Sequence, residues 1–97
     1  MTTVKIKSKK YHVLFSMRAL SAFEEVTGHA IAGMDLTKMT LKQLAQLCVE
    51  GLRAGGDKAG QPLTPEEDVE WYIDCMDNDP KLLTNVVDAF IKQNKKK

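Results

Sequence analysis

The sequence predicts an α+β protein that is mainly α-helical, with a short N-terminal β-hairpin packed on about four helices. Apolar residues near the N-terminus recur with a period of two, which is typical of strands, and those after residue 16 recur at helical spacing. A chain of 97 residues has room for one core. We therefore expect a single domain (1–97) with a hairpin at 4–15, helices at about 17–27, 41–54, 65–77 and 80–93, and a basic tail at 94–97.

The hairpin is predicted from two short alternating runs. Val4 and Ile6 form the first run, and the second run ends at Phe15. Residues 8–10, a serine and two lysines, interrupt the alternation and indicate a turn. An isolated hairpin is only marginally stable in water. We therefore expect its apolar face to pack on the helices.

The first helix has a typical residue at each end. Ser16 is a good N-cap, and Gly28 supplies the left-handed residue that ends many helices. The residues predicted to share its apolar face are Ala19, Leu20, Phe23 and Val26.

The second helix is predicted to start at a capping box made by Thr40 and Gln43. We expect it to stop at Gly55–Gly56, with residues 55–62 as a flexible linker. The residues of this helix that we expect in the core are Leu44, Cys48 and Leu52.

The last two helices are predicted from similar start signals. Thr64 and Glu67 form a second capping box, and Pro65 takes the first helical position, where its missing N–H costs nothing. Asp79–Pro80 repeats the N-cap and proline arrangement before the fourth helix.

No catalytic constellation assembles in the sequence. His12 and His29 lack partners at the spacing of metal ligands, and the acidic cluster around 66–77 lacks the ligand spacing of a calcium loop. The glycines near residue 55 do not follow a strand, as those of a phosphate-binding loop would. We therefore expect no enzyme, no metal site and no cofactor.

Charge and hydropathy limit the cellular locations and the classes of partner that are expected. The lysines are concentrated near the two ends of the chain, and Arg18 and Arg53 are the only arginines, so nucleic-acid binding is not expected. No apolar run approaches the roughly 18 residues of a membrane span, and the first ten residues lack the apolar region of a signal peptide. Cys48 and Cys75 lie in apolar helical patterns, which predicts reduced, buried thiols. We expect a cytoplasmic protein without a membrane partner.

Three short motifs carry a resemblance to a known family. Residues 16–20 (SMRAL) begin the first helix, residues 23–28 (FEEVTG) end it, and residues 50–53 (EGLR) lie in the leucine-rich second helix. In these motifs and in the order of its elements, the chain resembles the small tail assembly chaperones of long-tailed bacteriophages and prophages. The match is detailed over about residues 4–53 and follows the helical pattern alone beyond them.

The resemblance implies a non-enzymatic chaperone that binds the long, hydrophobic tape measure protein, keeps it soluble and helps to recruit tail tube protein. Such a protein acts in the host bacterial cytoplasm and is absent from the mature virion. Two other classes stay open on the sequence alone. One is a minor tail or connector protein that remains in the particle, and the other is a small regulatory helical binding protein.

The candidate partner-binding residues come from the third helix and from a loop. Trp71 and Cys75 lie one turn apart, well round from the main apolar stripe of the third helix. Either another element of the same chain covers this flank, or it receives a partner helix or a second copy of the chain. In the first case we expect the partner at the apolar residues of the 29–39 loop, which are Met34, Leu36 and Met39.

Overall fold

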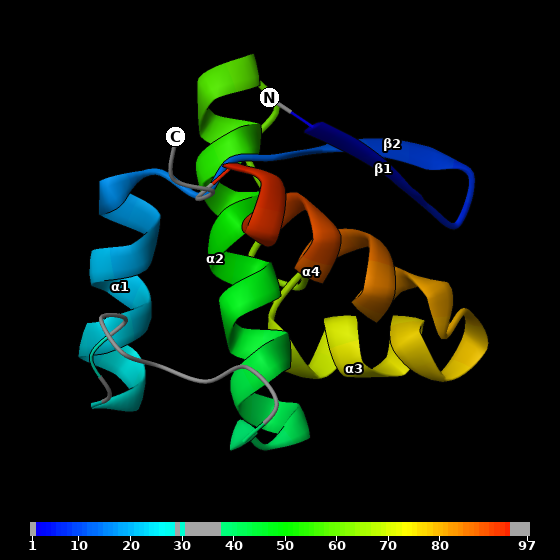
Figure 1. The fold of residues 1–97 in the computed structure, drawn as a ribbon. Coiled ribbons are helices and arrows are strands. Elements are labelled where there is room, and N and C mark those ends of the chain that lie inside the picture. Colours follow the sequence, from blue (N-terminus) through cyan, green and yellow to red (C-terminus); the bar gives the residue numbers. More distant parts are fainter. Residues whose placement is uncertain (1, 29, 31–37, 94–97) are drawn as a thin grey trace.

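The computed structural model describes residues 2–28, 30 and 38–93 (Figure 1). The elements in these residues are β1 (Thr2–Ile6), β2 (Lys9–Val13), α1 (Met17–Thr27), α2 (Leu41–Ala59), α3 (Val69–Asn78) and α4 (Lys81–Gln93). The predicted fold class, a mainly helical α+β protein with an N-terminal hairpin, is confirmed. The predicted basic tail at 94–97 lies outside the described residues.

β1 and β2 form an antiparallel hairpin with a two-residue turn. The turn residues Lys7 and Ser8 have φ values of 51° and 69°. Positive φ at both positions is the geometry of a type I′ turn, whose twist matches that of the strands. The turn predicted at 8–10 is therefore shifted, because Lys9 and Lys10 belong to β2. Lysines occur on both sides of the turn, so composition alone did not reveal its position.

One face of the hairpin is buried on the helices, as predicted. Val4 faces Tyr11 in the register of the two strands, so their side chains share a face. The hairpin residues that join the hydrophobic core with at most 8% exposure are Val4, Ile6, Tyr11 and Val13. Thr3, Lys5 and Lys10 are exposed on the opposite face.

α1 has the predicted bounds and the predicted caps. The Ser16 hydroxyl accepts a hydrogen bond from the N–H of Ala19 at 3.2 Å. Gly28 is left-handed, with a φ of 76°, and its N–H donates to the carbonyl of Glu24. Phe23 is fully buried, whereas Val26, predicted on the same face, is 61% exposed.

α2 is longer than predicted, because it continues through Gly55 and Gly56 as far as Ala59. A Cβ atom at Gly55 would collide with the carbonyl oxygen of His12, and one at Gly56 would lie 2.6 Å from the carbonyl oxygen of Gln61. Glycine inside a helix costs about 1 kcal/mol relative to alanine. Here it permits the backbone of β2 to pack directly on the helix. The predicted linker at 55–62 is therefore wrong over residues 55–59, which belong to α2.

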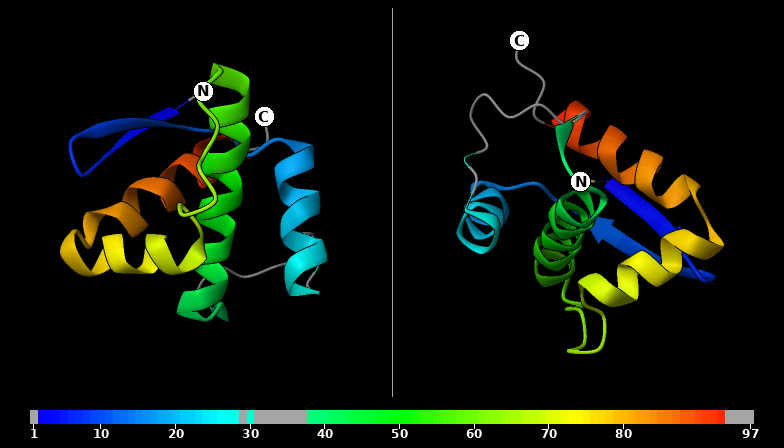
Figure 2. Two further views of the ribbon diagram at one scale, coloured as in Figure 1. Left: turned by 180° about the vertical axis from the view of Figure 1, so that it is seen from behind. Right: turned by 90° about the horizontal axis from the view of Figure 1, so that it is seen from below.

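α2 is the central element of the fold. It packs against α1 on one side and against β2, α3 and α4 on the other (Figures 1 and 2). Cys48 and Leu52 are buried as predicted, but Leu44 is only half-buried. Leu47 and Val49 are buried although neither is among the residues predicted for the core. A helix surrounded on several sides has no single apolar face, which explains why Leu47 and Val49 are buried.

The start of α3 differs from the prediction, whereas α4 agrees with it. Asp68 is the N-cap of α3, and its side chain accepts from the N–H of Trp71 at 2.9 Å. Of the predicted capping box, the Glu67 side chain does accept from the N–H of Thr64 at 2.8 Å. Residues 65–68 form turns and bends before the helix begins. α4 ends at Gln93, as predicted.

The hairpin lies on the side of α2 opposite to α1, next to α3 and α4 (Figure 1). In the view from below (Figure 2, right), α4 flanks the β1 side of the hairpin and α3 flanks the β2 side. α1 lies apart, across α2 (Figure 1). Among the helices in the described residues, none is both long and apolar enough to cross a membrane.

Candidate functional site

One of the three motifs behind the family resemblance, residues 50–53, joins α2 to the segment leading into α1. Glu50 is buried, and its Oε2 accepts from Gln46 Nε2 at 2.8 Å and from Arg53 Nη1 at 3.2 Å. The carbonyl of Gly51 accepts from the N–H of Leu14 at 3.0 Å. A Cβ atom at Gly51 would lie 2.6 Å from the ring of Phe15. Residues 50–53 therefore serve packing.

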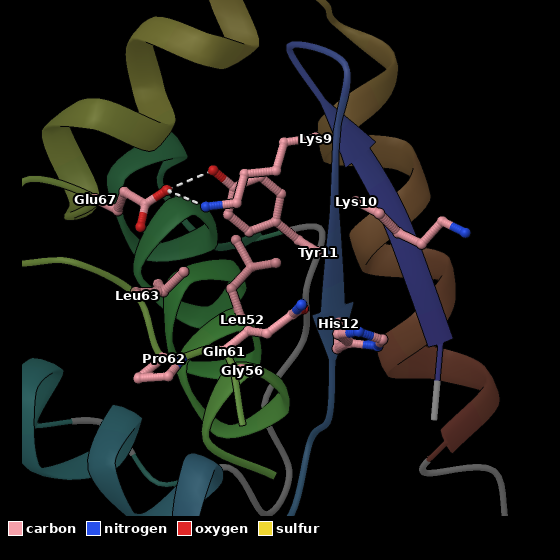
Figure 3. A pocket seen from close by; sticks show the side chains of 10 residues that line it. All are labelled: Lys9, Lys10, Tyr11, His12, Leu52, Gly56, Gln61, Pro62, Leu63 and Glu67. Atoms are coloured by element: carbon pink, nitrogen blue, oxygen red, sulfur yellow. Dashed lines mark hydrogen bonds and ion pairs between the residues drawn. The ribbon is translucent and has the colours of Figure 1, made fainter. Parts of the chain in front are cut away.

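A small pocket lies between β2, α2 and the segment that leads to α3 (Figure 3). Its lining includes Lys9–His12, Leu52, Gly56, Gln61–Leu63 and Glu67. The free volume is about 10 Å³. That is roughly the space of one water molecule. The pocket is therefore too small for a substrate or an organic cofactor.

The polar side of this pocket is a closed network of three side chains (Figure 3). The Tyr11 hydroxyl donates a hydrogen bond to Glu67 Oε2, and Lys9 Nζ lies 4.0 Å from the same oxygen. Lys9 Nζ also lies 5.1 Å from the centre of the Tyr11 ring. All three side chains are thus paired with one another, and they connect β2 to the start of α3.

The pKa shifts of Tyr11 and Glu67 hold these two groups in their ordinary protonation states. Burial and the hydrogen bond to Glu67 raise the pKa of Tyr11. Burial alone would raise the pKa of Glu67, but the hydrogen bonds from Tyr11 and Thr64 and the charge of Lys9 bring it below its ordinary value. The carboxylate stays ionised and the phenol stays protonated near neutral pH. Neither group is poised for proton transfer.

Trp71 and Cys75 lie beneath the hairpin of the same chain. The rings of Trp71 and Tyr11 are 5.7 Å apart, tilted by 49°. Trp71 is half-buried against the core, and Cys75 is 1% exposed. This arrangement corresponds to the first of the two alternatives for this flank, in which the chain itself covers it. Binding of a partner by the exposed part of Trp71 stays a prediction.

Of the three loop candidates for partner binding, Met39 is the one within the described residues. Met39 is half-buried and packs against the core. Met34 and Leu36 lie outside the described residues.

The other reactive side chains are placed as structural groups. Cys48 and Cys75 are both buried and unpaired, as predicted. Burial raises the pKa of the Cys48 thiol to about 12. Within residues 2–28, 30 and 38–93, no three His, Cys, Asp or Glu side chains are placed to hold a metal ion.

A larger, open groove lies where the C-terminal end of α1 meets the N-terminal end of α2. It has a volume of about 260 Å³ and is lined by Val26, Thr27, Thr40, Lys42, Gln43 and Gln46. Val26 is 61% exposed, and the neighbouring Leu41 is 55% exposed. We call this feature the α1–α2 groove.

A second open groove, the β1–α4 groove, follows the outer side of the hairpin. It has a volume of about 330 Å³ and is lined by Thr2, Thr3, Val4 and Lys5 of β1 and by Asn85, Asp88, Ala89 and Lys92 of α4.

Sequence reasoning missed both grooves. Val26 was assigned to the buried face of the first helix, because spacing alone does not show how few elements cover that helix. The signal that pointed toward the β1–α4 groove was the lysine-rich composition of the first strand, which was used only to argue against nucleic-acid binding.

Comparison with known protein families, with curated protein sequences and with solved structures finds no match to this chain. The resemblance to tail assembly chaperones therefore stays a prediction from the sequence.

Proposed function

We propose that the chain is a non-enzymatic protein-binding chaperone of the tail assembly type, which holds a helical segment of the tape measure protein in its α1–α2 groove. It would act in the host cytoplasm and leave before the virion is complete. The observation that carries the proposal is the exposure of Val26 and Leu41 beside a groove between two helices.

The packing of α1 explains why this groove is suited to a partner. α1 makes its extensive contacts with α2 and makes none of comparable extent with the other described elements. One flank of the helix is therefore left without a neighbour from the described chain. An amphipathic partner helix recognises such a surface by placing apolar side chains in the groove.

The chemistry of the groove is consistent with a client that is bound and then released. Apolar Val26 and Leu41 are accompanied by hydroxyl and amide side chains and by Lys42. Polar surroundings keep the surface soluble when it is empty, and a small apolar contact area gives modest affinity. A chaperone that leaves its client needs both properties.

The test is co-expression of the chain with the tape measure protein of the same phage or prophage. We expect the tape measure protein to become soluble and to copurify with the unmodified chain. Val26→Lys should abolish copurification, because it places a charge where an apolar helix would pack. The same change should keep α1 folded, since a lysine near a helix C-terminus is favourable.

The matched control is Ser21→Lys, which adds the same charge at an exposed position on the same helix. This variant should solubilise the client as the unmodified chain does. An equal loss of copurification in both variants, or unchanged copurification with Val26→Lys, would contradict the proposal that the α1–α2 groove binds the client. Finding the chain in purified virions would instead identify it as a resident tail or connector subunit.

A further inference from the structure

The outer edge of β1 has no strand beside it in the described structure. The sheet contains β1 and β2 only, within residues 2–28, 30 and 38–93. Ile6 faces Lys9 across the two-residue turn, and hydrogen-bonded pairs alternate with non-bonded pairs along an antiparallel ladder. The backbone N–H and C=O groups of Thr3 and Lys5 therefore point away from β2. An edge of this kind is a template for an added strand.

The β1–α4 groove provides space beside this edge. Thr3 and Lys5 line it from β1, and Asn85, Asp88 and Lys92 line it from α4. Figure 2 shows α4 running beside β1. The groove's volume of about 330 Å³ is at the lower end of the roughly 300–1,000 Å³ of binding clefts in general. A strand added to β1 would therefore find α4 beneath its side chains.

The charge around this edge is strongly one-sided. Residues 2–15 contain four lysines and no acidic residue. Lys5 faces Lys10 directly across the hairpin. Like charges in that position are destabilising. Lys92 adds a further positive charge from α4, and Asp88 is the one acidic residue in the groove lining.

Most of these lysines have no acidic partner within the described chain. Lys9 is paired with Glu67, at 4.0 Å. No ion pair is found for Lys5, Lys10 or Lys92 among the described residues. The hairpin thus maintains a repulsion between Lys5 and Lys10 that an acidic partner would relieve.

From these observations we propose that the β1 edge binds an extended, acidic peptide segment of a partner protein as a third strand. Backbone hydrogen bonds to Thr3 and Lys5 would give affinity, and carboxylates beside Lys5 and Lys92 would give specificity. This surface lies across α2 from the α1–α2 groove. The proposal does not depend on the chaperone function.

The same observations disfavour the two other occupants. A second copy paired through β1 would bring its own Lys5 and Lys7 to an edge that is already positive, and lysine at an edge is a known device against self-pairing. A nucleic acid would need aromatic or arginine side chains on this face. Tyr11 and Phe15 are instead buried, and the nearby cations are lysines.

The probe is a short synthetic peptide that alternates valine with glutamate and carries a fluorophore at one end. The matched control peptide has lysine in place of each glutamate. We expect the acidic peptide to bind the full chain saturably in fluorescence anisotropy, with an affinity that falls as salt rises. The basic peptide should not bind. Equal binding of the two peptides, or no saturable binding of the acidic one, overturns the proposal.

Thr3→Pro tests the backbone contact without changing a charge. Proline is tolerated on edge strands where the N–H faces away from the ladder, but it blocks an incoming strand. We expect acidic-peptide binding about tenfold weaker, the equivalent of one or two lost hydrogen bonds. Thr3→Val keeps the N–H and should bind as the unmodified chain does. A folded Thr3→Pro variant with unchanged affinity overturns the proposal.

Lys5→Gln and Lys92→Gln test the charge contact and remain informative if Thr3→Pro proves unfolded by circular dichroism. Each should weaken acidic-peptide binding about threefold and reduce its salt dependence. Val26→Lys should leave this binding unchanged, which separates it from the chaperone proposal. Tighter binding of a single-stranded oligonucleotide that displaces the peptide would assign the surface to nucleic acid instead, and would overturn the proposal.

Discussion

The Tyr11 hydroxyl on β2 donates a hydrogen bond to the Glu67 carboxylate, 56 positions later in the sequence. This contact joins the hairpin to the segment from which α3 begins. Lys9 approaches the same carboxylate, and Trp71 packs on the Tyr11 ring. The position of the hairpin on the helices therefore depends on a few polar and aromatic contacts as well as on the core.

Removing the Tyr11 hydroxyl should destabilise the protein. We expect Tyr11→Phe to lower the free energy of unfolding by about 1–2 kcal/mol, because Glu67 loses a hydrogen bond in a poorly solvated place. Chemical denaturation of Tyr11→Phe, Glu67→Gln and the double variant gives the coupling energy between the two side chains. Additive effects of the two substitutions would show that they do not interact.

Glu67 should also make the stability of the protein depend on acid pH. Its pKa is lower in the folded chain than the ordinary value of 4.5. The unfolded state therefore binds its proton first as the pH falls. The stabilisation is fully present above that ordinary value and is lost as the pH drops through the folded pKa.

The measurement is the free energy of unfolding between about pH 7 and pH 3, with the unmodified chain compared with Glu67→Gln. The difference in the free energy of unfolding between the unmodified chain and Glu67→Gln should shrink as the pH falls toward 3. Glu66→Gln is the matched control, because Glu66 is exposed and has no described ion pair. A difference between the unmodified chain and Glu66→Gln that shrinks in the same way would show that the effect is general acid denaturation.

The parts of the fold that depend on local signals were predictable from the sequence. Ser16, Gly28 and the Thr40–Gln43 capping box mark the helix ends where the structure has them. Gly55 was misread because its local preference is to break a helix, whereas the close approach of β2 determines its role. That approach joins residues distant in sequence, and no spacing rule contains it.

The candidate site was less predictable for the same reason. Helical spacing placed Trp71 and Cys75 away from the main stripe of α3, but it did not show that the same chain covers them. In the structure the Trp71 ring packs on Tyr11, and Cys75 is 1% exposed. The β1–α4 groove depends on how α4 lies beside β1, which also follows from tertiary packing. Lysine composition alone did not indicate that α4 forms a groove with this strand.

Gly55→Ala should destabilise the protein, although alanine is the better helix former. If residues 55–62 were a linker, the change would be neutral or stabilising. In the structure, the new methyl group would collide with the backbone of His12. Overpacking of this kind costs about 1–3 kcal/mol.

Gly51→Ala provides the comparison, because the three atoms nearest to its methyl group would all belong to the ring of Phe15. A ring can shift more easily than a strand backbone, so we expect a smaller loss of stability. Thermal melting of both variants by circular dichroism tests the order. A higher melting temperature for Gly55→Ala than for the unmodified chain would contradict the continuous α2 helix.

Trp71→Ala should destabilise the isolated chain, because the indole is held between the hairpin and the core. Its ring lies 5.7 Å from that of Tyr11 and 6.1 Å from that of Tyr72. Truncating a fully buried tryptophan to alanine costs about 3–5 kcal/mol of stability, so for this half-buried ring we expect a loss of about 2–3 kcal/mol.

Trp71 is the only tryptophan, so the unfolding of Trp71→Ala must be followed by circular dichroism. Trp71→Phe keeps a ring against Tyr11 and should recover much of the loss. A Trp71→Ala variant that keeps its stability but no longer binds the client would place Trp71 in the interface.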